Sequence, residues 1–313
     1  MSKKILIIGS GIAGISSSLK LKSYGLNSTI IDKGNFIGGR ASAREIKFDS
    51  NSEFFFHGAQ FFTAKTKEFK KVIQTGIRKK YIKEFENFCP KRYRGYKSMR
   101  EFLLALSKEL HIEQKVKIID IKPSKDKINV LDDKRNEWMS FDGVISTPPA
   151  PQNYQLLNEF PSLQETLKTG SYHACIALMF TFDEIPFDLK TFYDFYKKPG
   201  ILSWMAAGSC PNVWTVHTNE NFSDLNCNKD KNFLKQAIMS SIKKFFFGSK
   251  IKFHSLHVWK YAKVKKKCLG FKIDPDYPVA IAGDFLEGPN VEAAFTSGKK
   301  AADLIFERLR QTQ

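Results

Sequence analysis

The chain has 313 residues, enough to bury a substantial core in one or two domains. Its 50 Lys and Arg against 32 Asp and Glu give a formal net charge of +18, but no helix-turn-helix, zinc-finger or RNP pattern accompanies this charge, so the sequence does not predict a nucleic-acid-binding protein. No apolar stretch is long enough to span a membrane and the first predicted strand begins too close to Met1 for a signal peptide, so we expect a cytoplasmic protein without membrane contact.

A glycine-rich turn follows the first apolar run. Residues 5–8 (Ile-Leu-Ile-Ile) predict a buried strand, and the segment 9–14 has the GxGxxG spacing. Such glycines allow a tight turn and a close approach of the backbone to a pyrophosphate at the start of a helix, here predicted over 12–24. A second strand, predicted over 26–31, ends at Asp32, whose carboxylate can accept hydrogen bonds from a ribose. The alternative is a glycine-rich connection in another α/β protein, but strand, helix and acid together favour an adenine dinucleotide.

Two further segments favour FAD over NAD alone. Gly38-Gly39-Arg40 follows the second strand, where the glycines let the backbone pass close to a phosphate and the arginine adds a planar charged fork. Far downstream, an apolar strand over 278–284 ends in Gly283-Asp284, and an amphipathic helix begins near Asn290. A carboxylate at a strand end can hold polyol hydroxyls, and a helix N-terminus can face a second electron-rich group. FAD needs both kinds of contact, because its ribityl chain and its isoalloxazine ring extend well past the pyrophosphate.

The N-terminal and C-terminal motifs must meet around one cofactor, so the FAD-binding domain is predicted to be discontinuous. We assign residues 1–63, 98–155 and 256–313 to it, and residues 64–97 and 156–255 to a substrate domain. The first set includes a helix over 99–108 capped by Ser98 and strands over 115–121, 127–131, 137–141 and 143–147. The second set includes strands over 175–182, 201–206 and 213–218 and a helix over 230–246. The predicted fold class is α/β: a Rossmann-type FAD-binding domain with an inserted α+β substrate domain that contains an antiparallel sheet.

Short motifs along nearly the whole chain carry a family resemblance. Asp32-Lys33 with Gly38-Gly39-Arg40 resembles FAD-dependent amine-oxidase-type flavoproteins. Gly58-Ala59-Gln60-Phe61-Phe62-Thr63 and Trp259-Lys260-Tyr261-Ala262 resemble, more narrowly, renalase and its bacterial relatives. Further blocks occur in the family's order at 148–152, 214–217, 283–284, 291–294 and 297–298. The chain departs from the family pattern at Phe56, where an acidic residue is usual, and at Phe61, where tyrosine is usual.

The resemblance implies a non-covalently bound FAD and places an adenine contact at Val116. Motifs and resemblance together predict these cofactor-binding residues: Gly9, Gly11, Ile12, Ala13, Gly14, Asp32, Lys33, Gly39, Arg40, Ala59, Gln60, Phe61, Val116, Pro148, Gly283, Asp284, Val291 and Ala294. No histidine cluster and no pair of the five cysteines has the spacing of metal ligands, so no metal is predicted.

The predicted chemistry is hydride transfer, for which the protein must position a carbon–hydrogen bond against the cofactor. No Ser-His-Asp, Cys-His or paired-carboxylate signature occurs, and a dihydronicotinamide needs no general base. The predicted catalytic residues are Gln60, Phe61, Trp214, His217, Trp259 and Tyr261. Ordinary packing is the alternative for Trp259 and Tyr261, and a hydrogen-bonded core histidine is the alternative for His217.

The resemblance implies oxidation of the 2- or 6-dihydro isomers of NAD(P) to NAD(P)+, with dioxygen reduced to hydrogen peroxide. The substrate would then be an anionic dinucleotide, which the positive charge of the protein would attract. The alternatives are an amine oxidase, a desaturase-like flavoprotein with an apolar substrate, and a non-catalytic FAD-binding protein.

Overall fold

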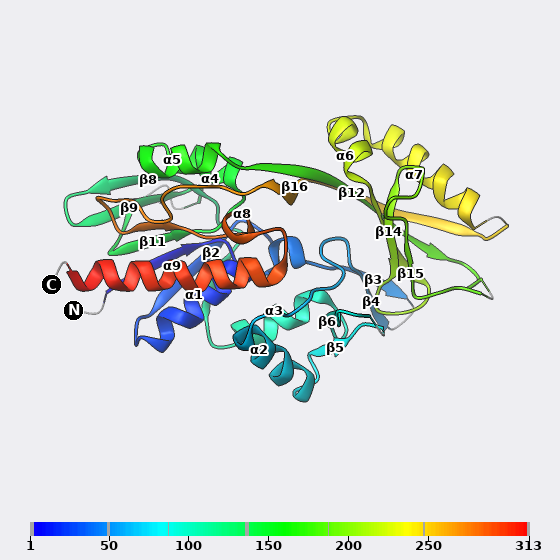
Figure 1. Ribbon diagram of the computed structural model, residues 1–313, viewed down its shortest axis with the longest axis horizontal. Helices are drawn as coiled ribbons and strands as arrows, with labels where there is room; N and C mark the ends of the chain where they lie inside the picture. Colours follow the sequence, from blue (N-terminus) through cyan, green and yellow to red (C-terminus); the bar gives the residue numbers. More distant parts are fainter. Residues whose placement is uncertain are drawn as a thin grey trace.

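The computed structural model describes residues 3–48, 51–86, 88–134, 138–186, 188–246 and 248–311. The molecule is elongated, and both termini lie at the same end (Figure 1). Two long antiparallel strands, β12 (Ser171–Phe182) and β16 (Ile251–Lys266), run from one half of the molecule into the other. Within the described ranges, no helix combines the length and the apolarity needed to cross a membrane.

A five-stranded parallel sheet forms the centre of the first half, in the order β17-β11-β1-β2-β7. Its strands are β1 (Ile5–Ile8), β2 (Ser28–Asp32), β7 (His111–Gln114), β11 (Gly143–Ser146) and β17 (Val279–Ile281). The strands β1, β11 and β17 are buried along their whole length, as parallel strands covered on both faces usually are. The Rossmann-type sheet predicted from the GxGxxG segment is thus confirmed.

One face of this sheet is covered by two helices, α1 (Ile12–Ser23) and α9 (Val291–Gln311), which pack against each other (Figure 1). Ser16 and Ser17 of α1 donate hydrogen bonds from their hydroxyls to carbonyl oxygens of α9, at 2.9 and 2.8 Å. Gly298 permits this approach, because a Cβ there would lie 2.1 Å from the Ala13 carbonyl oxygen. The packing fixes the N-termini of α1 and α9 relative to the carboxyl ends of the strands.

The other face carries an antiparallel meander and short helices. They are β8 (Ile118–Ser124), β9 (Lys127–Asp132), β10 (Trp138–Phe141), α4 (Ala150–Leu156), α5 (Pro161–Lys168) and α8 (Asp284–Glu287). The strand predicted over 115–121 is present as β8 but begins three residues later, because the chain turns between β7 and β8, with Lys115 at φ +61° and the Val116 amide donating to the Asp32 carbonyl. Residue 137, at the start of another predicted strand, lies outside the described residues.

The second half is built on a five-stranded antiparallel sheet in the order β13-β14-β15-β12-β16. The remaining members are β13 (Phe192–Asp194), β14 (Leu202–Ala207) and β15 (Val213–Thr218), and the helices are α6 (Glu220–Asn226) and α7 (Lys231–Phe245). Leu234, Ile238 and Ile242 of α7 pack against the sheet in one buried cluster. The predicted antiparallel sheet is therefore present, and α7 covers one of its faces.

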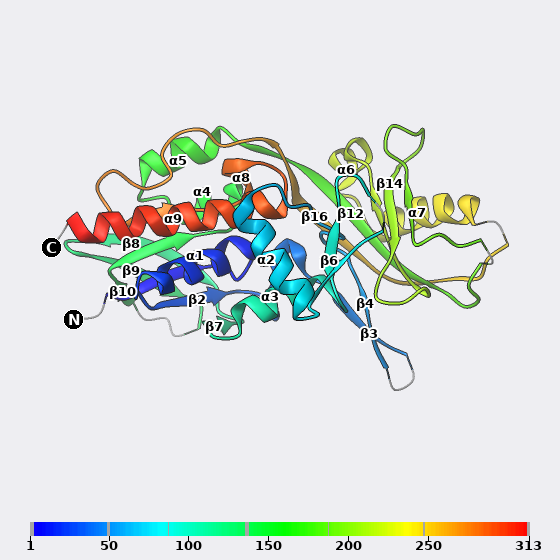
Figure 2. The same ribbon diagram turned by 60° about the horizontal axis from the view of Figure 1, so that its bottom comes forward.

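The remaining elements lie at one side of the junction between the halves (Figure 2). They are β3 (Arg44–Phe48), the 3-10 helix η1 (Gly39–Ala41), β4 (Asn51–Phe55), α2 (Lys67–Arg78), β5 (Ile82–Glu84), β6 (Tyr93–Gly95) and α3 (Met99–Ser107).

Packing divides the chain differently from the predicted domain boundaries. Phe69 and Ile73 of α2 belong to the cluster under α1 and α9, although residues 64–97 were assigned to the substrate domain. Leu163 and Leu167 of α5 belong to the cluster on the opposite face of the parallel sheet, although residues 156–255 were assigned likewise. The apolar faces of both helices complete the Rossmann core. The long strand β16 contributes to both halves.

Candidate cofactor and substrate cavity

A cavity of about 1430 Å³ runs from the carboxyl ends of the parallel strands to the antiparallel sheet. Its walls include the starts of α1 and α9, the segment around Gly58, the end of β15 and the middle of β16. A single ligand usually occupies roughly 300–1,000 Å³. The cavity is therefore large enough for an extended cofactor together with a second molecule.

The N-terminus of α1 forms one end of the cavity, and its three motif glycines have different roles. Gly9 has φ +101°, a conformation that favours glycine, and a Cβ at Gly14 would lie 1.9 Å from the Gly9 carbonyl oxygen. A Cβ at Gly11 would meet no protein atom within 4 Å. Gly11 lines the cavity, so the space beside it is available to a ligand. Together with the unpaired N–H groups of α1, this space fits a dinucleotide pyrophosphate.

Asp32 closes this end of the cavity beside Lys33 and Val116. Its Oδ2 accepts hydrogen bonds from the amide and hydroxyl of Ser10, at 2.6 and 2.7 Å, and its Oδ1 accepts one from the Gly34 amide at 2.6 Å. These bonds fix the carboxylate, and a carboxylate can still accept a further bond from a ribose hydroxyl. Lys33 Nζ lies 3.2 Å from Gln152 Oε1.

Arg40 was predicted to contact a phosphate, but in the structure its partner is a carboxylate. Instead of leaving its fork free for a phosphate, Arg40 forms a bidentate ion pair with Asp284, with Nη1 2.9 Å from Oδ2 and Nη2 2.5 Å from Oδ1. Burial lowers the pKa of Arg40, but the Asp284 carboxylate outweighs this and raises that pKa above its ordinary value. Nη1 also donates to the carbonyls of Tyr261 and Ala262. The pair thus joins η1, α8 and β16 where the two halves meet.

A group of ring side chains lines the cavity beyond Ala59. Trp259 Nε1 donates to the His57 carbonyl at 2.8 Å, and the His57 ring stacks on Trp259 with centroids 5.4 Å apart. The ring centroids of His257 and Trp259 lie 4.2 Å apart. His217 Nε2 lies 3.2 Å from the same His57 carbonyl oxygen. His57 and His257 were not among the residues predicted from the sequence.

Burial holds these histidines neutral. It lowers the pKa of His57 to about 3, with further positive charge from His257, Arg44 and His217, and lowers the pKa of His217 to about 4. We assign the proton of His217 to Nε2, because the nearby His57 carbonyl can only accept. Nδ1 is then left as an acceptor on a residue that lines the cavity.

Gln60 lies behind His217 and does not line the cavity. Trp204 Nε1 donates to Gln60 Oε1 at 2.8 Å, and Gln60 Nε2 lies 3.4 Å from both the Thr215 carbonyl and His217 Nε2. Since Trp204 Nε1 can only donate, it fixes the orientation of the Gln60 amide. With the His217 proton on Nε2, Gln60 Nε2 contacts that atom without a hydrogen bond and donates to the Thr215 carbonyl instead. Trp204 is a contributor that no sequence signal indicated.

Two other predicted catalytic residues are wrong. Trp214 is fully buried in the cluster under α7, where its Nε1 donates to the Pro211 carbonyl. Phe61 packs against Phe85 and Trp204 outside the cavity wall. By contrast, His217, Trp259 and Tyr261 line the cavity, as do all predicted cofactor-binding residues except Gly14, Gln60 and Phe61.

Comparisons with known proteins agree with this arrangement. Residues 7–75 match the family described as the NAD(P)-binding Rossmann-like domain. A 1-hydroxycarotenoid 3,4-desaturase from Flavobacterium sp. (strain P99-3) is 39% identical over 56 residues, a match that spans 17% of this chain and 12% of the desaturase. The family match covers residues 7–75, and the desaturase match covers only a small part of either chain.

Solved structures resemble the chain over nearly its full length. A protein described as a protoporphyrinogen oxidase from Exiguobacterium sp. 255-15 aligns with TM-score 0.72 and 12% identity, over 98% of this chain and 99% of its own. A fatty acid isomerase from P. acnes, which produces CLA, aligns with TM-score 0.72 and 12% identity over 97% and 98% of the two chains. An oxidoreductase from Methanosarcina mazei aligns with TM-score 0.64 and 11% identity over 96% and 100%.

The fold combines a Rossmann-type parallel sheet, whose first strands lie in the segment that matches the NAD(P)-binding family, with an antiparallel sheet, and residues of both halves line the cavity. The predicted class, an FAD-dependent oxidoreductase, agrees with the comparisons, which include an oxidase, a desaturase and an oxidoreductase. The narrower resemblance to renalase stays a prediction.

Proposed function

We propose that the protein is an FAD-dependent oxidase of dihydronicotinamides, acting on the 2- or 6-dihydro isomers of NAD(P). A bound FAD would supply the two-electron chemistry, taking a hydride from the substrate ring and passing the electrons to dioxygen, which leaves as hydrogen peroxide. Residues at the starts of α1 and α9, with Asp32 and Val116, would hold the cofactor. The proposal is supported by the neutral, hydrogen-bonding character of the wall around His217.

The carboxylates of the cavity wall are the main observation against an amine substrate. Within the part of the chain that the structure describes, Asp32, Glu220 and Asp284 are the acidic residues that line the cavity. Asp32 accepts three hydrogen bonds, Glu220 pairs with Lys263, and Asp284 pairs with Arg40. A protonated amine would find no uncommitted carboxylate, and neutral histidines offer no counter-charge.

A neutral dihydronicotinamide ring suits the same wall. Its carboxamide N–H can donate to His217 Nδ1, the acceptor left by the tautomer assigned above. Trp259 and Tyr261 add flat ring surface to the wall. His217 would then position the substrate ring without moving a proton, in keeping with the absence of any general base in the motif pattern. A wholly apolar substrate fits less well, because Ser203, Thr218 and Asn219 also line this region.

The experiment is anaerobic stopped-flow reduction of the FAD-loaded protein. We expect rapid bleaching of the flavin by 2- or 6-dihydro-NAD(P) and none by amines. His217→Ala should keep the flavin spectrum and reduce the bleaching rate by about 10- to 100-fold, because the ring loses its position. His254→Ala is the matched control, since His254 bonds Thr181 outside the cavity wall. Bleaching by amines alone, or a colourless protein that cannot bind FAD, would contradict the proposal.

A further inference from the structure

The end of the cavity beyond His217 is built without the parallel sheet. Its walls come from residues 195–198 after β13, from residues 218–221 at the end of β15 and the start of α6, and from Lys260 and Lys263 of β16. The predicted dinucleotide-binding residues at the start of α1 and at Asp32 belong to the other half, whereas Arg40 and Asp284 lie beside β16. This outer end is therefore available to the part of a substrate that extends away from the reacting ring.

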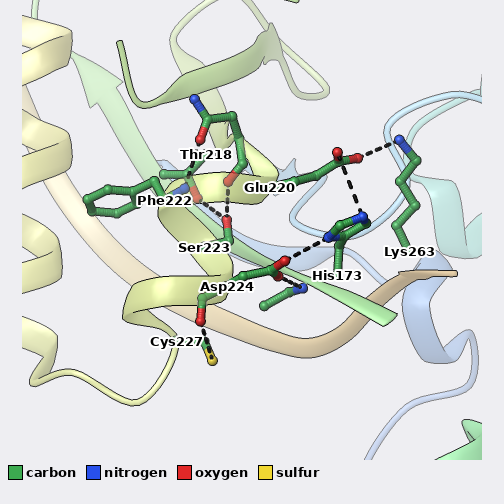
Figure 3. Close-up of polar contacts among 10 residues, drawn as sticks. His173, Thr218, Glu220, Phe222, Ser223, Asp224, Cys227 and Lys263 are labelled. Atoms are coloured by element: carbon green, nitrogen blue, oxygen red, sulfur yellow. Dashed lines mark hydrogen bonds and ion pairs between the residues drawn. The ribbon is translucent and has the colours of Figure 1, made fainter. Parts of the chain in front are cut away.

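An ionic network fixes one side of the outer end (Figure 3). Lys263 Nζ lies 2.7 Å from Glu220 Oε1, and His173 Nε2 lies 3.9 Å from Glu220 Oε2. His173 Nδ1 in turn lies 2.7 Å from Asp224 Oδ2, and Asp224 Oδ1 accepts from the Ala174 amide. The network ties α6 to β12 and β16 and holds Glu220 on Lys263.

The remaining cations of the outer end have no such partner. Four lysines line it, namely Lys197, Lys198, Lys260 and Lys263, against the single carboxylate of Glu220. Among the residues that the structure describes, no carboxylate forms an ion pair with Lys197, Lys198 or Lys260; Lys260 instead donates to the neutral side chain of Asn228 at 2.8 Å. The outer end thus carries uncompensated positive charge.

An exposed aromatic residue stands among these lysines. Tyr196 lines the cavity with 73% of its surface exposed, in a turn where its amide donates to Asp194 Oδ1 and the Lys198 amide donates to the Phe195 carbonyl. Lys197 takes φ +60° in the same turn. A planar ring beside several ammonium groups matches a nucleotide, whose base stacks on aromatic rings and whose phosphate attracts lysine.

We propose that this outer end is a nucleotide-phosphate subsite, in which Lys197, Lys198 and Lys260 bind the phosphates of the substrate and Tyr196 stacks on its base. The subsite deepens the proposed function by assigning the dinucleotide part of the substrate to named residues. Glu220 opposes the bound phosphate, and its pairing with Lys263 limits this repulsion.

Direct binding of ADP-ribose to the FAD-loaded protein tests the subsite without any redox reaction. We expect the triple variant Lys197→Ala/Lys198→Ala/Lys260→Ala to bind ADP-ribose about tenfold or more weakly by calorimetry at low salt. The control, Lys243→Ala/Lys244→Ala/Lys252→Ala, removes the same charge from exposed residues outside the cavity and should bind ADP-ribose normally. Glu220→Gln should change the affinity in the opposite direction and tighten binding severalfold, because it removes the opposing charge and keeps a hydrogen-bonding side chain beside Lys263.

Unchanged ADP-ribose affinity in the triple variant, or equal losses in the triple variant and its control, would overturn the subsite. Binding of a long-chain fatty acid in place of ADP-ribose by the wild-type protein would also overturn it. A different outcome would contradict the proposed function alone. If ADP-ribose binding depends on the three lysines but no dihydronicotinamide bleaches the flavin, the phosphate subsite is supported and the substrate is a different phosphorylated compound. If both hold, 1-methyl-dihydronicotinamide, which has no phosphate, should be oxidised equally well by the triple variant and the wild type.

Discussion

Arg40 and Asp284 connect the N-terminal and C-terminal segments through one bidentate ion pair, so each should matter for folding even without a cofactor. We expect Arg40→Ala to lower the free energy of unfolding by about 2–3 kcal/mol, because Asp284, with only 6% of its surface exposed, loses its charged partner. Lys33→Ala should change it by about 0.5 kcal/mol or less, since Lys33 bonds only the neutral Gln152. Urea unfolding of the cofactor-free protein measures both.

The double variant Arg40→Ala/Asp284→Ala is the decisive control. If the pair is the source of the stability, the double variant should lose less than the sum of the two single variants. Additive losses would mean that Arg40 acts through its bonds to the Tyr261 and Ala262 carbonyls instead.

The buried neutral histidines predict the pH dependence of stability. Burial lowers the pKa of His57 to about 3 and that of His217 to about 4, whereas both titrate near 6.5 when unfolded. Between pH 6.5 and 4 the unfolded chain binds more protons, so stability should fall with falling pH by about 1.4 kcal/mol per pH unit for each histidine. Above pH 6.5 neither histidine contributes a slope.

Chemical denaturation between pH 4.5 and 7.5 tests this pH dependence. His217→Gln should have a flatter slope than the wild type between pH 4.5 and 6.5 and the same slope above it. Comparing the variant with the wild type removes the contributions of the carboxylates, which titrate in both. An unchanged slope would show that His217 has the same pKa in the folded and unfolded states, which would reopen the case for a titrating catalytic histidine.

Strand β15 illustrates what the sequence could determine at the level of an element. Its bounds were predicted over 213–218 and are observed at Val213–Thr218. Successive side chains of a strand point to opposite faces, so Trp214 and His217 cannot both face the cavity. Which face is buried depends on α7, whose apolar side covers Trp214 and Val216. That tertiary contact leaves no local signature, so the prediction included Trp214 wrongly.

The N-cap of α1 at Gly11 and the contact of α1 with Gly298 of α9 offer a matched pair of substitutions that separate cofactor binding from folding. Gly11→Ala places a methyl group where no protein atom lies within 4 Å, so the cofactor-free protein should keep its stability. The same methyl group occupies space beside the helix N-terminus, so FAD should bind about tenfold or more weakly. Flavin fluorescence on dilution measures this affinity.

Gly298→Ala should show the reverse pattern, because its Cβ would lie 2.1 Å from the Ala13 carbonyl and force α9 away from α1. We expect a loss of about 1–3 kcal/mol in the free energy of unfolding, as overpacking usually causes. A Gly11→Ala protein that unfolds more easily but binds FAD normally would refute the placement of the pyrophosphate at α1.

At the scale of the whole molecule, the sequence predicted that distant motifs meet around one cavity, because both carry features of a single cofactor. It did not indicate that α2 and α5 pack on the Rossmann core, since any amphipathic helix could supply the side chains that make this contact. The Arg40–Asp284 pair was likewise missed. Each residue was assigned separately to the cofactor, and a pairing between residues 244 positions apart is set only by the fold.

The net charge of +18 predicts how an anionic substrate reaches the cavity. A positive field accelerates the encounter with a dinucleotide. Salt screens that field, and the Debye length falls from about 30 Å at 0.01 M salt to about 8 Å at 0.15 M. The second-order rate of flavin reduction by dihydro-NAD(P) should therefore fall by about tenfold over this range of salt. The rate with uncharged 1-methyl-dihydronicotinamide should stay constant, because steering acts only on the charged substrate. Equal salt dependence for both substrates would show that salt acts on the conformation of the protein and not on the attraction of the substrate. The excess of lysine would then contribute to solubility and not to the rate of encounter.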